Sequence, residues 1–171
     1  MRRATPALLI AIAAAFALAS CGGDDEPATP TKAEYKQTYT ALSKELAIVG
    51  AAVGEAVAKS AGKSNKQLEK TFNTVAEQTR DIAGKFENAT PPADPTVRTQ
   101  QAKLVAGLNL AADDLEAISK AAGKKDLKAA GEAAAKLTRD NTAVSTPRVA
   151  LEKALGIPQP KPPVTTTTRK K

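Results

Sequence analysis

Residues 94–123, DPTVRTQQAKLVAGLNLAADDLEAISKAAG, decide the fold. Asp94 followed by Pro95 is typical of a helix N-cap and first helical position, because the carboxylate accepts from first-turn amides and proline needs no amide partner. Apolar side chains then recur every three or four residues, which is the spacing of one helical face. This face contains Val97, Leu104, Leu108, Ala111, Leu115, Ile118 and Ala122. The stretch predicts a long helix with one buried face, ended by Gly123.

Two further helices are predicted before this one. Thr31 with Glu34 three residues later is a capping box, and the helix that it starts is expected to end at Gly62. Ser64 and Gln67 form a second capping box. The apolar faces consist of Tyr35, Tyr39, Leu42, Leu46, Val49, Val53 and Val57 in the first helix and Leu68, Phe72, Val75, Thr79, Ile82, Ala83 and Phe86 in the second.

A fourth helix is expected from about Asp126, with an alanine-rich face that buries little area. Thr146-Pro147 resembles another N-cap and first position, so a separate short helix is predicted from there to Gly156. The connections are short, which favours antiparallel neighbours. The sequence therefore predicts an all-α fold, an antiparallel up-down four-helix bundle with a short C-terminal helix, over residues 31–157.

The N-terminus has the layout of a secretory signal. Met1-Arg2-Arg3 is positively charged, residues 7–18 are apolar and uncharged, and small residues follow. The apolar run is shorter than the roughly 20 residues that a membrane-spanning helix needs. A lone transmembrane anchor is the alternative, but the polar stretch 22–26, GGDDE, ends the run abruptly.

Leu18-Ala19-Ser20-Cys21 resembles the lipobox of bacterial lipoprotein precursors. The resemblance implies cleavage between Ser20 and Cys21 and a diacylglyceryl group on the Cys21 thiol. Residues 1–20 are then the signal peptide and 21–30 a flexible tether, and the mature chain is lipid-anchored on the extracytoplasmic face of the cell membrane. The alternative for Cys21, a small buried hydrophobic side chain, fits poorly beside two glycines and an acidic run. The alanine-rich mature region resembles exported actinobacterial lipoproteins in composition only.

Charge is concentrated at the two ends of the chain. The formal net charge is +7, yet Arg2, Arg3 and the tail over residues 158–171 carry most of it. A nucleic-acid partner is therefore not expected, since it would need a basic patch on the fold. The Pro/Thr-rich tail is expected to be disordered. Its basic end, Arg169, Lys170 and Lys171, is interpreted as solubilising or as a contact with anionic lipid headgroups or a wall polymer.

Few side chains could carry chemistry. The chain has no histidine and one cysteine, which excludes Ser-His-Asp triads and histidine metal sites. Asp113 and Asp114 point about 100° apart on a helix and are expected on a solvated face. Asp24-Asp25-Glu26 lacks the spacing of a calcium loop. We expect no catalytic residue, no metal site and no cofactor.

Two helical features leave alternatives open. Gly50 and Gly54 form a Gly-x-x-x-Gly pair, for which close helix packing or chance is the expectation. Asn141 lies on the apolar stripe of the fourth helix. It is interpreted either as a satisfied polar residue near the bundle end or as a ligand contact inside the bundle.

Three functions follow from these observations. The leading hypothesis is a non-enzymatic, lipid-anchored bundle that presents a surface to an envelope protein. The alternative is a small-molecule or lipid carrier, which a cavity of several hundred cubic ångström between the helices would favour. An enzyme would have only carboxylate, hydroxyl or lysine chemistry at its disposal.

Overall fold

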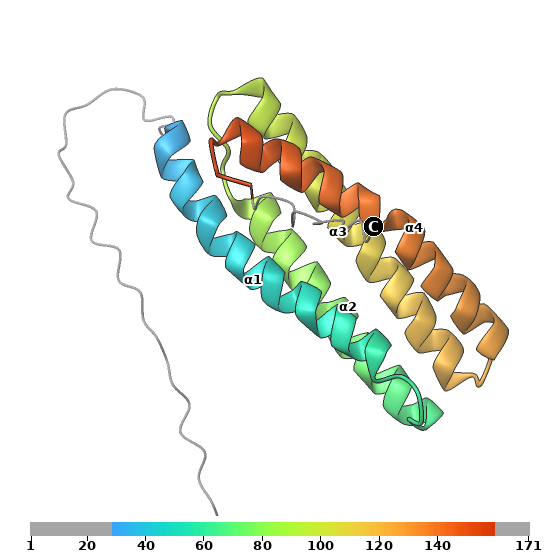
Figure 1. Ribbon diagram of the computed structural model, residues 1–171. Coiled ribbons are helices and arrows are strands. Elements are labelled where there is room, and N and C mark those ends of the chain that lie inside the picture. Colours follow the sequence, from blue (N-terminus) through green and yellow to red (C-terminus); the bar gives the residue numbers. More distant parts are fainter. Residues whose placement is uncertain (1–28, 160–171) are drawn as a thin grey trace, which may run out of the picture.

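The computed structural model describes residues 29–159, which form four helices and no strand (Figure 1). The helices are α1 (Lys32–Ala58), α2 (Asn65–Asn88), α3 (Pro95–Gly123) and α4 (Leu127–Ala154). Successive helices run antiparallel and are joined by short loops (Figure 1). The predicted all-α four-helix bundle is confirmed. None of the helices in this part of the chain is long and apolar enough to cross a membrane.

The helices begin where the capping signals predict. Glu34 accepts from the Thr31 amide at 2.7 Å, and the Thr31 hydroxyl accepts from the Glu34 amide at 3.3 Å. Ser64 and Gln67 form the same reciprocal pair. Asp94 accepts from the first-turn amide of Thr96 at 2.8 Å. Each cap satisfies amides that have no partner inside the helix.

The helix ends agree with the sequence less well. α1 ends at Ala58, four residues before Gly62, which lies in the following loop with a φ of 79°. α3 includes Gly123 in its last turn, and the left-handed residue that closes it is Lys125, with a φ of 60°. The amides of Lys125 and Asp126 donate to Ala122 and Ala121, the two bonds of a Schellman motif.

The separate C-terminal helix predicted at Pro147 is wrong. α4 continues through Pro147 to Ala154 as one helix. Because proline has no amide hydrogen, the carbonyl of Ala143 loses its helical donor. Pro147 is buried, so packing against the bundle holds this turn in place.

The core consists of two apolar clusters along the bundle. One contains both tyrosines of α1 together with Phe86, Leu104, Leu151 and Leu155. The other, centred on Phe72, Leu115 and Ile118, is completed by alanines of α4 at its edge. Backbone packing joins α1 to α2, α2 to α3 and α3 to α4. The first and last helices, α1 and α4, are bridged by side chains alone.

Candidate ligand-binding groove

α1 and α4 are held together at one end of the bundle. The Tyr39 hydroxyl donates to Glu152 at 3.4 Å, and the Lys36 ammonium donates to the carbonyl of Gly156 at 2.9 Å. The Tyr39 ring lies 5.9 Å from that of Phe86, centroid to centroid. Burial raises the pKa of Tyr39 to about 12. The large rings fill this end of the α1–α4 interface.

The other end of the same interface is hollow. A groove of about 470 Å³ lies between the C-terminal half of α1 and the middle of α4. Its floor comes from Thr79 of α2 and from Leu108, Ala111 and Leu115 of α3. The walls are formed by Leu46, Val49, Gly50, Val53, Gly54, Val57 and Ala58 of α1 and by Leu137, Thr138, Asn141 and Val144 of α4. We call this site the α1–α4 groove.

The sequence explains why only one end is filled. Along the inner face of α1, tyrosines give way to leucines, then to valines and glycines. On the α4 side, Leu151 and the C-cap residue Leu155 fill the tyrosine end, while Asn141 and Thr138 of α4 line the groove together with the glycines. A Cβ added at Gly50 or at Gly54 would meet no atom within 4 Å. Close packing at this glycine pair is therefore excluded, because the pair borders open space, and chance remains of the two expectations.

Polar atoms in the groove come from three residues. Thr79 is buried, and its hydroxyl donates to the carbonyl of Val75 at 2.8 Å. Thr138 likewise donates to Ala134 at 3.0 Å. Asn141 is exposed at the rim, in the middle of α4, where water can satisfy its amide. It therefore lies neither near the bundle end nor inside the bundle, the two places expected from the sequence.

A buried glutamine in the second turn of α3 joins α1 to the C-terminal end of α2. Gln101 accepts from the Tyr35 hydroxyl at 2.6 Å and donates to the carbonyls of Phe86 and Ala89 at 2.6 and 2.7 Å. Burial raises the pKa of the Tyr35 hydroxyl well above its usual range. Sequence reasoning missed Gln101, although it lies three residues before Leu104 and four after Val97, in step with the apolar stripe.

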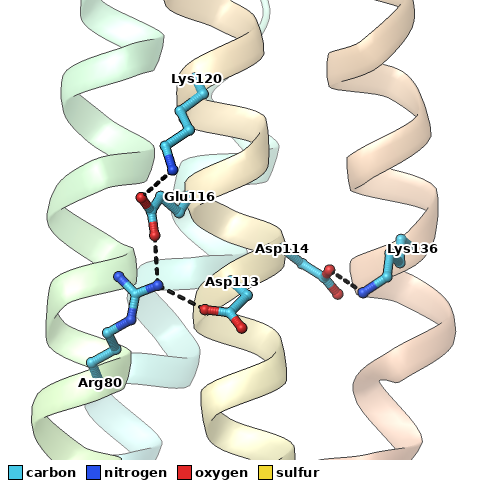
Figure 2. A network of polar contacts seen from close by, with 6 residues as sticks. All are labelled: Arg80, Asp113, Asp114, Glu116, Lys120 and Lys136. Atoms are coloured by element: carbon cyan, nitrogen blue, oxygen red, sulfur yellow. Dashed lines mark hydrogen bonds and ion pairs between the residues drawn. The ribbon is translucent and has the colours of Figure 1, made fainter.

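The acidic cluster of α3 divides between two faces, as Figure 2 shows. Asp113 is exposed, as expected, and binds Arg80 of α2 at 2.7 Å. The expectation for Asp114 is wrong, because this residue is only 3% exposed and its carboxylate binds Lys136 of α4 at 2.5 Å. Its second oxygen, Oδ2, has no hydrogen-bond partner within the described part of the chain. The pair joins α3 to α4.

Glu116 is the centre of the second half of this network. Hydrogen bonds from Lys120 and Arg80 lower the pKa of Glu116 to about 2 (Figure 2). Glu116 and Asp113 in turn raise the pKa of the Arg80 guanidinium. These ion pairs lie on the outer side of α2 and α3, and none of their residues lines the groove. Their arrangement is that of a structural clamp.

Other predicted sites lie outside the described residues. These are the lipobox residues Leu18, Ala19 and Ser20, the lipidation site Cys21, and the basic residues Arg169, Lys170 and Lys171. Within residues 29–159, no group of three or more Asp, Glu, His or Cys side chains is placed to hold a metal ion.

Comparison with protein-family models, with curated proteins and with solved structures finds no match to this chain. The four-helix class and the geometry of the groove therefore provide the basis for a functional hypothesis.

Proposed function

We propose that this chain is a lipid-anchored lipoprotein of the extracytoplasmic face of the cell membrane, and that it binds an apolar small molecule or lipid without catalysing a reaction. The observation that carries the binding role is the α1–α4 groove, which has a volume of about 470 Å³, residues from all four helices and no charged side chain in its lining. Three other depressions of about 480–550 Å³ in the described part of the chain each have charged side chains in their lining. Small-molecule sites are typically concave, apolar cavities of about 300–1,000 Å³ with a few polar groups.

The lack of titratable groups in the groove supports a non-enzymatic role. Its lining consists of aliphatic residues, glycines, two threonines and one asparagine. General acid–base catalysis needs a group whose pKa lies near the working pH. The carboxylates with charged partners lie elsewhere, as in the pairs of Glu116 with Arg80 and of Asp114 with Lys136.

Anchoring is supported by the lipobox-like stretch that ends at Cys21. Two acyl chains on one residue give stable attachment, whereas one chain is marginal. Mass spectrometry of the membrane fraction tests this role in cells that express the wild type or Cys21→Ala. The wild type should begin at a lipid-modified Cys21, and the variant should stay uncleaved or lack lipid. An uncleaved wild type with a free thiol would overturn the anchor.

Binding in the groove can be blocked without disturbing the core. Leucine at position 54 would project into the open space beside Gly54, whereas Gly131 lies exposed on α4, away from the groove. The wild type and Gly131→Leu should both enhance the fluorescence of diphenylhexatriene, an uncharged rod-shaped dye that is dark in water, and Gly54→Leu should not. Equal dye binding by all three proteins would refute the groove as a binding site.

A protein-binding module is the second candidate. Ile48 on α1 is 70% exposed, which favours a contact surface there. Single exposed apolar side chains are common on soluble domains, so this support is weaker than that of the groove. Crosslinking in intact cells should capture an envelope protein with the wild type and lose it with Ile48→Glu. Unchanged capture by the variant would eliminate Ile48 as the contact.

The basic tail is a second candidate for contact with the membrane or wall in either case. Arg169, Lys170 and Lys171 could each contribute about 1 kcal/mol near an anionic surface. Deletion of residues 158–171 should then lower retention in the wall fraction at low salt, and the difference from the wild type should vanish as salt screens the charges. Retention that is independent of the deletion contradicts the contact.

A further inference from the structure

The dimensions of the α1–α4 groove restrict what can occupy it, and this inference rests on the proposed binding role. The α1 wall runs from Leu46 to Ala58, which is about 18 Å at a helical rise of 1.5 Å per residue. Division of the volume of about 470 Å³ by this length gives a mean cross-section of about 26 Å². The α3 floor from Leu108 to Leu115 and the α4 wall from Leu137 to Val144 each cover about 10.5 Å of this length, so the groove is enclosed along its middle and open toward its ends.

A single alkyl chain has these dimensions. Carbon–carbon bonds of about 1.5 Å in a tetrahedral zigzag advance about 1.25 Å per carbon, so about 14 carbons span the groove. A methylene group is close in size to a water molecule, which takes about 30 Å³, so the volume holds about 16 of them. Length and volume therefore agree on one chain, with a cross-section of about 24 Å².

A helix is too wide for the same space. With its side chains, an α-helix is about 10–12 Å across, which corresponds to a cross-section of about 80–110 Å². This is at least three times the mean cross-section of the groove. A helix from a partner protein, or from a second copy of this chain, could cover the groove but could not lie within it.

We propose that the α1–α4 groove binds one straight acyl chain of about 14–16 carbons, supplied by a lipid of the membrane to which the protein is anchored. The chain lies along α1 between Leu46 and Ala58, against valines and glycines. The ten peptide units from Cys21 to Thr31 span at most about 35 Å, and α1 adds about 21 Å before Leu46. The groove therefore stays within reach of the bilayer surface.

The polar end of the lipid belongs at the rim. No charged side chain lines the groove, so a headgroup has no counter-ion inside it. Asn141 lies at the exposed α4 edge, and its amide can donate to the ester or carboxyl oxygen that ends an acyl chain. The hydroxyl of Thr138, one helical turn away, donates to the Ala134 carbonyl and its oxygen can still accept a hydrogen bond.

The test measures how affinity depends on chain length. Straight fatty acids of 8 to 20 carbons are titrated, below their micelle concentrations, into the chain from residue 21 onward with Cys21→Ala, which carries no acyl group of its own. Each added methylene should tighten binding about threefold to fourfold. The gain should stop at about 14–16 carbons, where further methylenes extend into water. Asn141→Ala should weaken binding of every chain length by the same factor, about twofold to tenfold.

Matched variants separate the groove from other apolar surface. Gly54→Leu fills the groove and should weaken binding of a 14-carbon acid by at least tenfold, while Gly131→Leu should leave it unchanged. Leucine forms helix better than glycine, so the midpoint of thermal unfolding should not fall in either variant.

The outcomes distinguish this inference from the binding role itself. Dye binding that Gly54→Leu abolishes, together with fatty-acid affinities that do not depend on chain length, would overturn the acyl chain and keep the groove. Affinity that continues to rise through 20 carbons would overturn the single-chain geometry. If neither dye nor fatty acids respond to Gly54→Leu, both proposals fail.

Discussion

Replacement of Gly107 by alanine tests how closely α3 and α4 approach each other. A Cβ on Gly107 would overlap the carbonyl oxygen of Ala143 and lie 2.6 Å from its carbonyl carbon. Both atoms are backbone, so no side chain can turn aside. Pro147 removes the helical donor of this carbonyl, which leaves its oxygen facing the Gly107 Cα hydrogens in a weak Cα–H···O contact. The approach therefore depends on the absence of a side chain at position 107.

The magnitude follows from two opposing effects. Overpacking against an unyielding neighbour costs about 1–3 kcal/mol. Glycine to alanine within a helix contributes about 0.5–1 kcal/mol of stability in the other direction. Gly107→Ala should therefore lower the free energy of unfolding by about 1–2 kcal/mol. Gly131→Ala has the same propensity gain with nothing within 4 Å of its Cβ, so it should raise the free energy by about 0.5–1 kcal/mol.

Urea unfolding followed by circular dichroism measures both variants, with an unchanged m-value as the check that the unfolded state is unaltered. The difference between the two variants isolates the cost of the contact, because their propensity terms cancel. If Gly107→Ala stabilises the protein as much as Gly131→Ala does, α3 and α4 do not approach at this point, and the account given for Gly107 is wrong.

The remaining predictions concern the caps, the buried glutamine, the tyrosines and the groove glycines. Lys125→Gly should raise the free energy of unfolding by about 1 kcal/mol because Lys125 has a φ of 60°, whereas Lys124→Gly, at a helical φ, should lower it by up to about 1 kcal/mol in the same urea assay. Gln101→Leu should cost about 2–4 kcal/mol because it leaves the Tyr35 hydroxyl and the Ala89 carbonyl without their partner and removes one of the two donors to the Phe86 carbonyl, and the exposed control Gln37→Leu should stay within about 0.5 kcal/mol. Stability should fall as the pH rises above 10, because the unfolded chain loses the Tyr39 proton near 10 and the folded chain only near 12; the pKa of Tyr35 is raised as well, so Tyr39→Phe should reduce this fall without abolishing it, with tyrosinate absorbance as the readout. Gly50→Ala combined with Gly54→Ala should raise the free energy of unfolding by about 1–2 kcal/mol, and a fall would mean that an unseen contact occupies that face.

The features that the sequence predicts well are local. Capping boxes join residues three apart, and a helical stripe repeats every three or four, so the four helices and their starts can be read from the chain alone. The interpretation of Pro147 as a first helical position failed because a buried proline can be held inside a helix by tertiary packing. No local signal marks Lys125 as left-handed. Glycine usually takes this conformation at a helix end, but Gly123 lies two residues earlier, inside α3.

The candidate site depends on contacts that are distant in sequence. The groove exists because residues of α1 face residues of α4 roughly 90 positions later, as Leu46 and Val144 do. Asp114 was expected in solvent because its partner, Lys136, lies on another helix. The decrease in side-chain size along α1 can be read from the sequence. Which residues of α4 lie opposite the small side chains cannot, because that depends on how the two helices pack.

The hollow end of the α1–α4 interface contains residues that lower the stability of the fold. Gly50 and Gly54 each weaken α1 by about 0.5–1 kcal/mol relative to alanine, and neither is required for a turn, a positive φ or a close approach. Larger side chains at these positions would bury additional apolar surface at about 25 cal/mol per Å². The opposite end of the same interface, with Tyr35 and Tyr39 fully buried, shows that this fold accommodates large side chains between α1 and α4. Packing within the bundle therefore does not account for the glycines. Gly84 and Gly131 have equally open surroundings outside the groove, so a glycine without neighbours is by itself no sign of a ligand, and the measurement that assigns Gly54 to a site is its effect on binding.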